Sequence, residues 1–212
     1  MEDLIHTLIE KSKYKKPLMV AISGIDGSGK GYVGAKLNAL LQERGINSHL
    51  IGIDGWLEVP QKRFSGTNPA EHFYRHGFRF EEMFAKLIMP LSKTGSIDLV
   101  ANHSAPDNSN ALTEYHYKIE NAAIVIFEGI FLFQKKFEFD YRIWIDCSFE
   151  TAFARALNRN QEGLTAAELK RDYDNIYFAA QRLHFEHDQP RQMADFIILN
   201  DHKFTGYPKS FD

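Results

Sequence analysis

Short apolar runs and helical apolar stripes alternate along this chain. Five mostly apolar segments are typical of buried strands, and they cover residues 18–23, 48–54, 122–127, 141–146 and 194–199. Apolar residues at helical spacing fill the intervals, and an earlier stripe contains Leu4, Ile5, Leu8 and Ile9. Because strands that alternate with helices favour parallel pairing, the pattern predicts an α/β fold with a central five-stranded parallel sheet.

Two helix starts carry capping residues. Asn68 is followed by Pro69 at the first helical position and by Glu71, and Thr165 with Glu168 has the capping-box spacing. The first start predicts helical pieces that reach about residue 92, with an interruption near Gly77. The second predicts part of a lid and C-terminal helical region over about 155–190.

The stretch 96–119 has a different pattern. Residues 96–102 and 113–119 are short, partly alternating segments on either side of a polar stretch, which predicts a small hairpin or lid insert. A length of 212 residues suits one domain with such an insert. We therefore expect residues 1–212 to form a single domain.

Composition limits the functional classes. The chain is 44% hydrophobic and 25% charged, with a net charge of −3, which is typical of a globular protein. That balance gives no electrostatic reason to expect nucleic-acid binding, and the lysine-rich stretch 11–16 is expected to be solvated. We expect no nucleic-acid partner.

No segment is long and apolar enough to cross a membrane. The longest unbroken apolar run is 122–127, whereas a spanning helix needs about 20 residues. The N-terminus carries Glu2 and Asp3 and lacks the apolar core of a secretory signal. The single cysteine, Cys147, cannot form an internal disulfide. A cytoplasmic location without a membrane partner is therefore expected.

The strongest chemical signal is the segment Gly24-Ile25-Asp26-Gly27-Ser28-Gly29-Lys30. It has the glycine and lysine spacing of a Walker A phosphate loop, and it lies between a predicted strand and a predicted amphipathic helix. In such a loop, backbone N–H groups and a helix N-terminus surround phosphate oxygens, and the lysine reaches the β- and γ-phosphates. With Gly31 and Tyr32 included, the segment predicts a binding site for ATP. It also predicts the three-layer sandwich fold of a P-loop NTPase.

Gly31 departs from this motif. The position normally holds Ser or Thr, whose hydroxyl coordinates Mg²⁺, and the neighbouring Tyr32 is too long to replace it. Three interpretations stay open: a water molecule takes the ligand position, the magnesium site is weakened, or the protein binds nucleotide without efficient turnover.

Two carboxylates end predicted strands, at the sheet edge where ligands of open α/β sheets bind. Asp54 could accept the proton of a hydroxyl group that attacks the γ-phosphate, or it could stand near magnesium. Glu128 could orient magnesium or its waters. Each could also be structural, so a metal site at Asp54 and Glu128 is a hypothesis.

Basic and aromatic residues supply further candidates. Arg155 and Arg159 lie four residues apart on one predicted helix, and guanidinium groups suit the charge that develops in phosphoryl transfer. An aromatic and basic cluster follows Asp54, and its candidates for binding the acceptor substrate are Trp56, His72 and Arg79. A metal at the helical pair of His184 and His187 is disfavoured because no third ligand is apparent.

Together, these motifs resemble the uridine kinase family of P-loop kinases, which includes phosphoribulokinase and bacterial pantothenate kinase. The resemblance covers most of residues 17–201. It rests on the phosphate loop, Ile53-Asp54-Gly55-Trp56, Glu128-Gly129, the pair Arg155 and Arg159, and Ala194-Asp195 in the final strand.

The resemblance implies ATP-dependent transfer of a phosphoryl group to a hydroxyl of a small molecule, with ATP and Mg²⁺ as cofactors. It also implies that Asp54 is the base, that Lys30 holds the phosphates and that Arg155 and Arg159 are lid arginines. A nucleoside is the leading acceptor. Pantothenate-, glycerate- and sugar-phosphate-type acceptors stay open, as do a nucleotide-binding module with weakened catalysis and a homo-oligomer.

Overall fold

A five-stranded parallel sheet forms the centre of the protein. The computed structural model describes residues 1–105, 109–159 and 163–201. The strand order is β2-β5-β1-β6-β7, and every neighbouring pair is parallel. The strands are β1 Leu18–Gly24, β2 Ser48–Gly52, β5 Ile124–Glu128, β6 Tyr141–Asp146 and β7 Phe196–Leu199. The predicted α/β fold with five parallel strands is confirmed.

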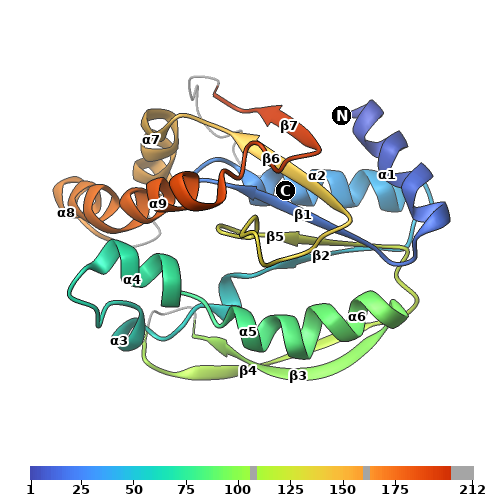
Figure 1. Ribbon diagram of the computed structural model, residues 1–212, viewed down its shortest axis with the longest axis horizontal. Coiled ribbons are helices and arrows are strands. Elements are labelled where there is room, and N and C mark those ends of the chain that lie inside the picture. The colour runs from blue at the N-terminus through green and yellow to red at the C-terminus, as the bar shows by residue number, and fades with distance from the viewer. Residues whose placement is uncertain (106–108, 160–162, 202–212) are drawn as a thin grey trace.

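Helices cover both faces of this sheet (Figure 1). One face carries α1 Glu2–Tyr14 and α2 Lys30–Glu43. The other described helices are α3 Pro60–Arg63, α4 Pro69–His76, α5 Phe80–Met83, α6 Met89–Thr94, α7 Phe149–Arg159, α8 Ala166–Asp172 and α9 Phe178–Asp188. Two π-helical turns, Phe84–Ile88 and Tyr173–Tyr177, join α5 to α6 and α8 to α9. Within the described ranges, no helix combines the length and apolar character of a membrane span.

The two faces of the sheet bury separate apolar clusters, and β1 contributes to both. Val20 and Ile22 pack in the cluster beneath α1 and α2, whereas Met19 and Ala21 belong to the cluster on the opposite face. Successive side chains of a strand point to opposite faces, so both sets must be apolar when both faces are covered. This is why the strands read as unbroken apolar runs.

An antiparallel hairpin lies beside α5 and α6 (Figure 1). Its strands are β3 Ile97–Ser104 and β4 Leu112–Ile119, paired with Ala101 opposite Tyr115. Ala101, Tyr117 and Ile119 are buried and join the larger apolar cluster. The predicted hairpin insert over 96–119 is confirmed.

Local capping signals predict helix starts well, whereas four of the five predicted strands, all but 141–146, differ at one or both bounds by one or two residues. The Asn68 side chain accepts a hydrogen bond from the Glu71 N–H at 3.3 Å, and Thr165 with Glu168 forms a complete capping box. The second strand, predicted to reach Asp54, ends at Gly52. The chain then tightens into a 3₁₀ turn, Asp54–Trp56, in which the Trp56 N–H donates to the Ile53 carbonyl oxygen at 2.8 Å.

Candidate active site

The glycine-rich loop connects β1 to α2 and holds its lysine inward. Lys30 is the first residue of α2, its side chain is buried, and its Nζ donates to the Ile25 carbonyl oxygen at 3.0 Å. Gly27 has φ of 74°, and a Cβ built there would lie 2.4 Å from the Ala152 carbonyl oxygen of α7. Only glycine fits a left-handed backbone packed this closely.

Lys30, Asp54 and Glu128 come together at the carboxyl ends of three neighbouring strands. Glu128 is the last residue of β5 and pairs in register with Gly52 of β2 and Ile22 of β1. Asp54 opens the turn after β2, where the surrounding protein desolvates its carboxylate although part of the side chain stays accessible to solvent, while Glu128 is half-buried. The Lys30 ammonium lies within electrostatic range of both carboxylates.

The surroundings favour the neutral forms of both carboxylates. Desolvation by the enclosing protein raises the pKa of Asp54, Asp26 adds to this rise, and Lys30 opposes it. Desolvation likewise raises the pKa of Glu128, with the charge of Asp54 adding to the rise and Lys30 opposing it. A further positive charge would therefore stabilise both ionised groups.

The two carboxylates fit a magnesium ion that arrives with a nucleotide. A Cβ built on Gly31 would lie 3.8 Å from Glu128 Oε2, and one built on Gly52 would lie 3.7 Å from the same oxygen. Across the described residues, no group of three or more metal-binding side chains occurs. Protein sites for Mg²⁺ commonly use one or two carboxylates and leave the remaining positions to phosphates and waters.

The two predicted lid arginines have different surroundings. Arg155 Nη1 donates to the Ser28 carbonyl oxygen at 3.2 Å, and its Nη2 donates to the Asn200 carbonyl oxygen at 2.8 Å. Arg159 is exposed at the end of α7, and its charge acts to lower the pKa of Asp54. Arg155 therefore contacts the phosphate loop, whereas Arg159 acts on the carboxylate.

The sequence analysis missed two side chains that hold the loop. Asn200 Nδ2 donates to the Ser28 carbonyl oxygen at 2.7 Å, and the buried Tyr173 hydroxyl donates to Asp26 Oδ2 at 2.6 Å. Asn200 directly follows β7, so its place at a strand end was a usable signal. Tyr173 carries only a helical apolar pattern, which gives no hint of its hydroxyl contact.

The predicted acceptor contacts are dispersed. Trp56 is fully buried, and its Nε1 donates to the Tyr117 hydroxyl oxygen at 2.9 Å. His72 lies on α4, with Nε2 at 2.8 Å from the Lys62 carbonyl oxygen. Trp56 and His72 thus make internal contacts, and their predicted role in acceptor binding stays a prediction.

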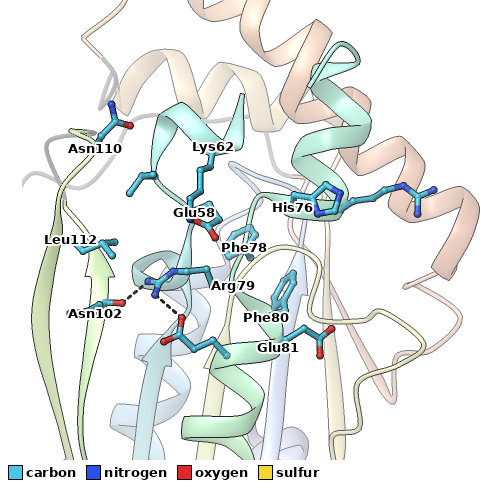
Figure 2. Close-up of a pocket in the computed structure, with 13 residues that line it drawn as sticks. Glu58, Lys62, His76, Phe78, Arg79, Phe80, Glu81, Asn102, Asn110 and Leu112 are labelled. Atoms are coloured by element: carbon cyan, nitrogen blue, oxygen red, sulfur yellow. Dashed lines mark hydrogen bonds and ion pairs between the residues drawn. The ribbon is translucent and has the colours of Figure 1, made fainter. Parts of the chain in front are cut away.

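Arg79 lines a cavity of about 690 Å³ beside the hairpin (Figure 2). Its guanidinium group forms an ion pair with Glu82 at 2.9 Å and lies 5.4 Å from the Trp56 ring centroid. It also donates to the carbonyl oxygens of Gly55 and Asn102, which joins the Asp54 turn to β3. Neither Asp54 nor the phosphate loop lines this cavity, so acceptor binding by Arg79 also stays a prediction.

A second cavity, of about 380 Å³, lies between β2 and the hairpin. Gly52 and Gly55, which flank Asp54 in the chain, line one side. Aromatic and imidazole rings of the hairpin line the other, among them His103, Tyr115 and Tyr117. This cavity adjoins the segment that carries Asp54.

Arg63 is a further residue that the sequence analysis missed. It is buried at the end of α3, within electrostatic range of Asp54 and Tyr177. Burial lowers the pKa of its guanidinium group, and Tyr177 and Asp54 oppose that change. Arg63 therefore places a buried positive charge near Asp54.

His184 and His187 belong to no group of three or more metal-binding side chains among the described residues. His184 is buried, with Nδ1 at 2.8 Å from Asp188 Oδ2, and the Tyr74 hydroxyl donates to the same carboxylate. This network joins α4 to α9 inside the molecule.

Comparisons with known proteins identify the fold. No protein-family model matches the chain, and no curated protein matches it by sequence. Among solved structures, a possible uridine kinase from Bacillus stearothermophilus is 21% identical, covers 93% of this chain and 98% of its own, and has a TM-score of 0.71. A candidate fructose transport system kinase from Silicibacter sp. TM1040 is 19% identical, with 92% and 97% covered and a TM-score of 0.74.

A more distant match is the D-glycerate 3-kinase from Cryptococcus neoformans. It is 11% identical, with 89% of this chain and 88% of that chain covered and a TM-score of 0.57. These kinases share the sheet and the flanking helices over nearly the whole chain. The chain therefore has the fold of the uridine kinase-like P-loop kinases.

Proposed function

We propose that this protein is a kinase that transfers the γ-phosphoryl group of ATP to a hydroxyl of a small molecule. The observation that carries the proposal is the meeting of Lys30, Asp54 and Glu128 at one end of the sheet, beside the glycine-rich loop. A loop for phosphates and a carboxylate for a hydroxyl proton are the two parts that this reaction needs.

Each side chain has a defined task in the proposed reaction. The loop N–H groups and Lys30 bind the β- and γ-phosphates. Asp54 accepts the hydroxyl proton as the acceptor oxygen bonds to the γ-phosphorus and the bond to the ADP oxygen breaks. Arg159, exposed near Asp54, is suited to neutralise charge on the transferred group.

Glu128, with Asp54, would hold magnesium beside Gly31. The ion would neutralise phosphate charge and orient the γ-phosphoryl group. Glu128 Oε2 faces the place where the usual Walker A hydroxyl would stand, so the carboxylate and a water can share that task.

A nucleoside is the acceptor class that we propose first. The cavity of about 380 Å³ beside Asp54 has a size suited to a small molecule, and its rings suit stacking on a flat heterocycle. Arg63 favours a second candidate, an acceptor with a carboxylate or phosphate, because a buried guanidinium group near Asp54 would pair with such an anion.

Acceptor-dependent release of ADP tests the proposal. The panel contains nucleosides, pantothenate, glycerate and sugar phosphates, each with ATP and Mg²⁺. We expect a signal with one acceptor class that Asp54→Asn lowers by orders of magnitude while ATP binding stays nearly intact. Lys30→Ala should weaken ATP binding and turnover together. Unchanged turnover in Asp54→Asn would show that Asp54 is not the base, and unchanged ATP affinity in Lys30→Ala would contradict the phosphate site.

A further inference from the structure

We propose that Asn200 is a positioning residue for the phosphate loop, and that Arg155 acts with it instead of reaching the transferred phosphoryl group. The inference deepens the proposed function, since it rests on nucleotide binding at the loop. It concerns the peptide between Ser28 and Gly29, which lies inside the glycine-rich segment.

Two donors hold the carbonyl group of this peptide. Asn200 Nδ2 lies 2.7 Å from the Ser28 carbonyl oxygen, and Arg155 Nη1 lies 3.2 Å from the same oxygen. Arg155 Nη2 donates in addition to the Asn200 carbonyl oxygen at 2.8 Å, which closes a triangle of hydrogen bonds. The loop, α7 and the end of β7 are thereby joined at one point.

The direction of this carbonyl group fixes the direction of a loop N–H. In a trans peptide, the C=O and N–H bonds point to opposite sides. When the Ser28 oxygen is turned toward Asn200 and Arg155, the Gly29 N–H must point away from them. Backbone N–H groups that converge on one side of such a loop are what bind phosphate oxygens. Asn200 therefore orients the Gly29 N–H, a donor that can bind phosphate. Its own hydrogen bond goes to the Ser28 carbonyl oxygen and not to the nucleotide.

The backbone around Asn200 is itself well anchored. Its N–H donates to the Asp146 carbonyl oxygen at 2.8 Å, and the next residue, Asp201, accepts hydrogen bonds from the Ser148 N–H at 3.1 Å and from the Ser148 hydroxyl at 2.6 Å. A Cβ built on Gly29, where φ is 91°, would lie 2.6 Å from Asn200 Nδ2. The close approach of the amide to the loop thus depends on glycine at that position.

The test compares a ligand that carries a nucleobase with one that consists of phosphates alone. The affinities of ATP and of inorganic tripolyphosphate are measured by calorimetry for the wild-type protein, for Asn200→Ala and for Asn200→Asp, which keeps the side-chain shape but lacks the donor. Asn175→Ala, at an exposed residue of the Tyr173–Tyr177 turn, is the matched control. Lys30→Ala reports separately on the phosphate site, and the unfolding midpoint without ligand verifies that each variant is folded.

We expect Asn200→Ala to lose about five- to tenfold in affinity for ATP and for tripolyphosphate alike, which is the usual effect of one hydrogen bond. Asn200→Asp should lose at least as much for both ligands, because its carboxylate also places a negative charge beside the loop. The double variant with Arg155→Gln and Asn200→Ala should lose less binding free energy than the sum of the two single variants, because both donors bind the same oxygen. A loss of affinity for ATP alone would overturn the proposal, because Asn200 would then contact the nucleoside part of ATP and would not orient the loop.

Unchanged affinity for both ligands in Asn200→Asp would also overturn the proposal, provided that the wild type binds ATP and Lys30→Ala does not. A wild-type protein that binds neither ligand would instead overturn the proposed function together with this inference. Because Asn200→Asp keeps the packing of the side chain, a folding defect in Asn200→Ala leaves the test intact.

Discussion

Gly31 is the residue at which a single side chain would change how magnesium is held. A Cβ built there meets no protein atom nearer than Glu128 Oε2 at 3.8 Å, so Gly31→Ser should fit without strain. The new hydroxyl would supply the missing ligand oxygen. We expect the Mg²⁺ concentration for half-maximal ADP release to fall about three- to tenfold, with faster turnover, because the hydroxyl would replace a water molecule that the ion must otherwise order.

Gly31→Ala is the matched control for that substitution, since it adds the Cβ without the hydroxyl. Its Mg²⁺ dependence should stay at the wild-type level. Equal changes of the Mg²⁺ dependence in Gly31→Ser and Gly31→Ala would mean that the added Cβ alters the site by packing. An unchanged Mg²⁺ dependence in Gly31→Ser would contradict the interpretation that Gly31 weakens the magnesium site.

The pKa of Asp54 makes the activity sensitive to acid. The group acts as a base only when ionised, so turnover is lost as the pH falls through its pKa. Desolvation raises the pKa of Asp54, whereas Lys30 and Arg159 act to lower it. The acid limb of the kcat/KM profile for ATP, which reports on the enzyme before the nucleotide and its magnesium bind, should therefore lie above the ordinary aspartate value of about 3.9. Arg159→Gln removes one lowering charge and should move the limb to still higher pH.

Arg171→Gln serves as the control for this shift. Arg171 is an exposed arginine of α8 that pairs with Asp172 at 3.0 Å, and it is absent from the charges that act on Asp54. The position of the limb is measured, so a lower rate in Arg159→Gln does not obscure the result. A limb that stays in place or moves to lower pH would contradict Asp54 as the titrating base.

At the scale of elements, the sequence predicts the parts that depend on local pattern. The β6 strand has the predicted bounds, and the caps at Asn68 and Thr165 form the predicted hydrogen bonds. The predicted end of β2 was wrong because Ile53, which follows the strand, is apolar and fully buried like a strand residue. Pattern alone cannot separate the last residue of a strand from a buried apolar residue that follows it.

The Tyr173–Tyr177 turn joins α8 and α9 to the glycine-rich loop through one hydroxyl group. Tyr173 donates to Asp26 Oδ2 at 2.6 Å, while Asp26 Oδ1 accepts from the Gly27 N–H at 2.9 Å. Tyr173→Phe keeps the buried ring and removes only the donor. We expect unfolding to become easier by about 1 kcal/mol and ATP affinity to fall about fivefold, as for the loss of one hydrogen bond.

Thermal unfolding and ATP titration of the same samples test Tyr173→Phe. Tyr14→Phe, on a side chain that is 90% exposed on α1, should leave both quantities unchanged. A loss of stability at constant ATP affinity would mean that the Tyr173 contact stabilises the fold only. The helices α8 and α9 would then have no effect on nucleotide binding through this contact.

At the scale of the whole molecule, two regions differ in how far the sequence predicts them. The proposed nucleotide side lies at the ends of neighbouring parallel strands, and a contiguous motif marks it. The proposed acceptor side lies between the Asp54 turn and the hairpin, which meet only through tertiary contacts. Trp56 illustrates the difference: its sequence position predicts an acceptor contact, while the hairpin covers it completely.

Tyr117 is the residue through which the hairpin supports the Asp54 turn. Its hydroxyl oxygen accepts from Trp56 Nε1 at 2.9 Å and lies 2.7 Å from His103 Nε2. Burial lowers the pKa of His103, so its ring is neutral near pH 7 and Nε2 can accept the tyrosine proton. Burial also raises the pKa of Tyr117 to about 12, which keeps that proton in place. The three side chains thus form a connected network between the hairpin and the turn.

Tyr117→Phe should therefore damage the acceptor side and spare the nucleotide side. It leaves the Trp56 N–H and the His103 ring without their shared partner, a loss of about 1–3 kcal/mol for buried polar groups. We expect KM for the acceptor to rise about tenfold at nearly constant KM for ATP. Tyr14→Phe, on a side chain that is 90% exposed on α1, removes a hydroxyl group far from the hairpin and should change neither constant. Equal rises in both KM values would mean that the hairpin stabilises the whole sheet and does not specifically support the acceptor side.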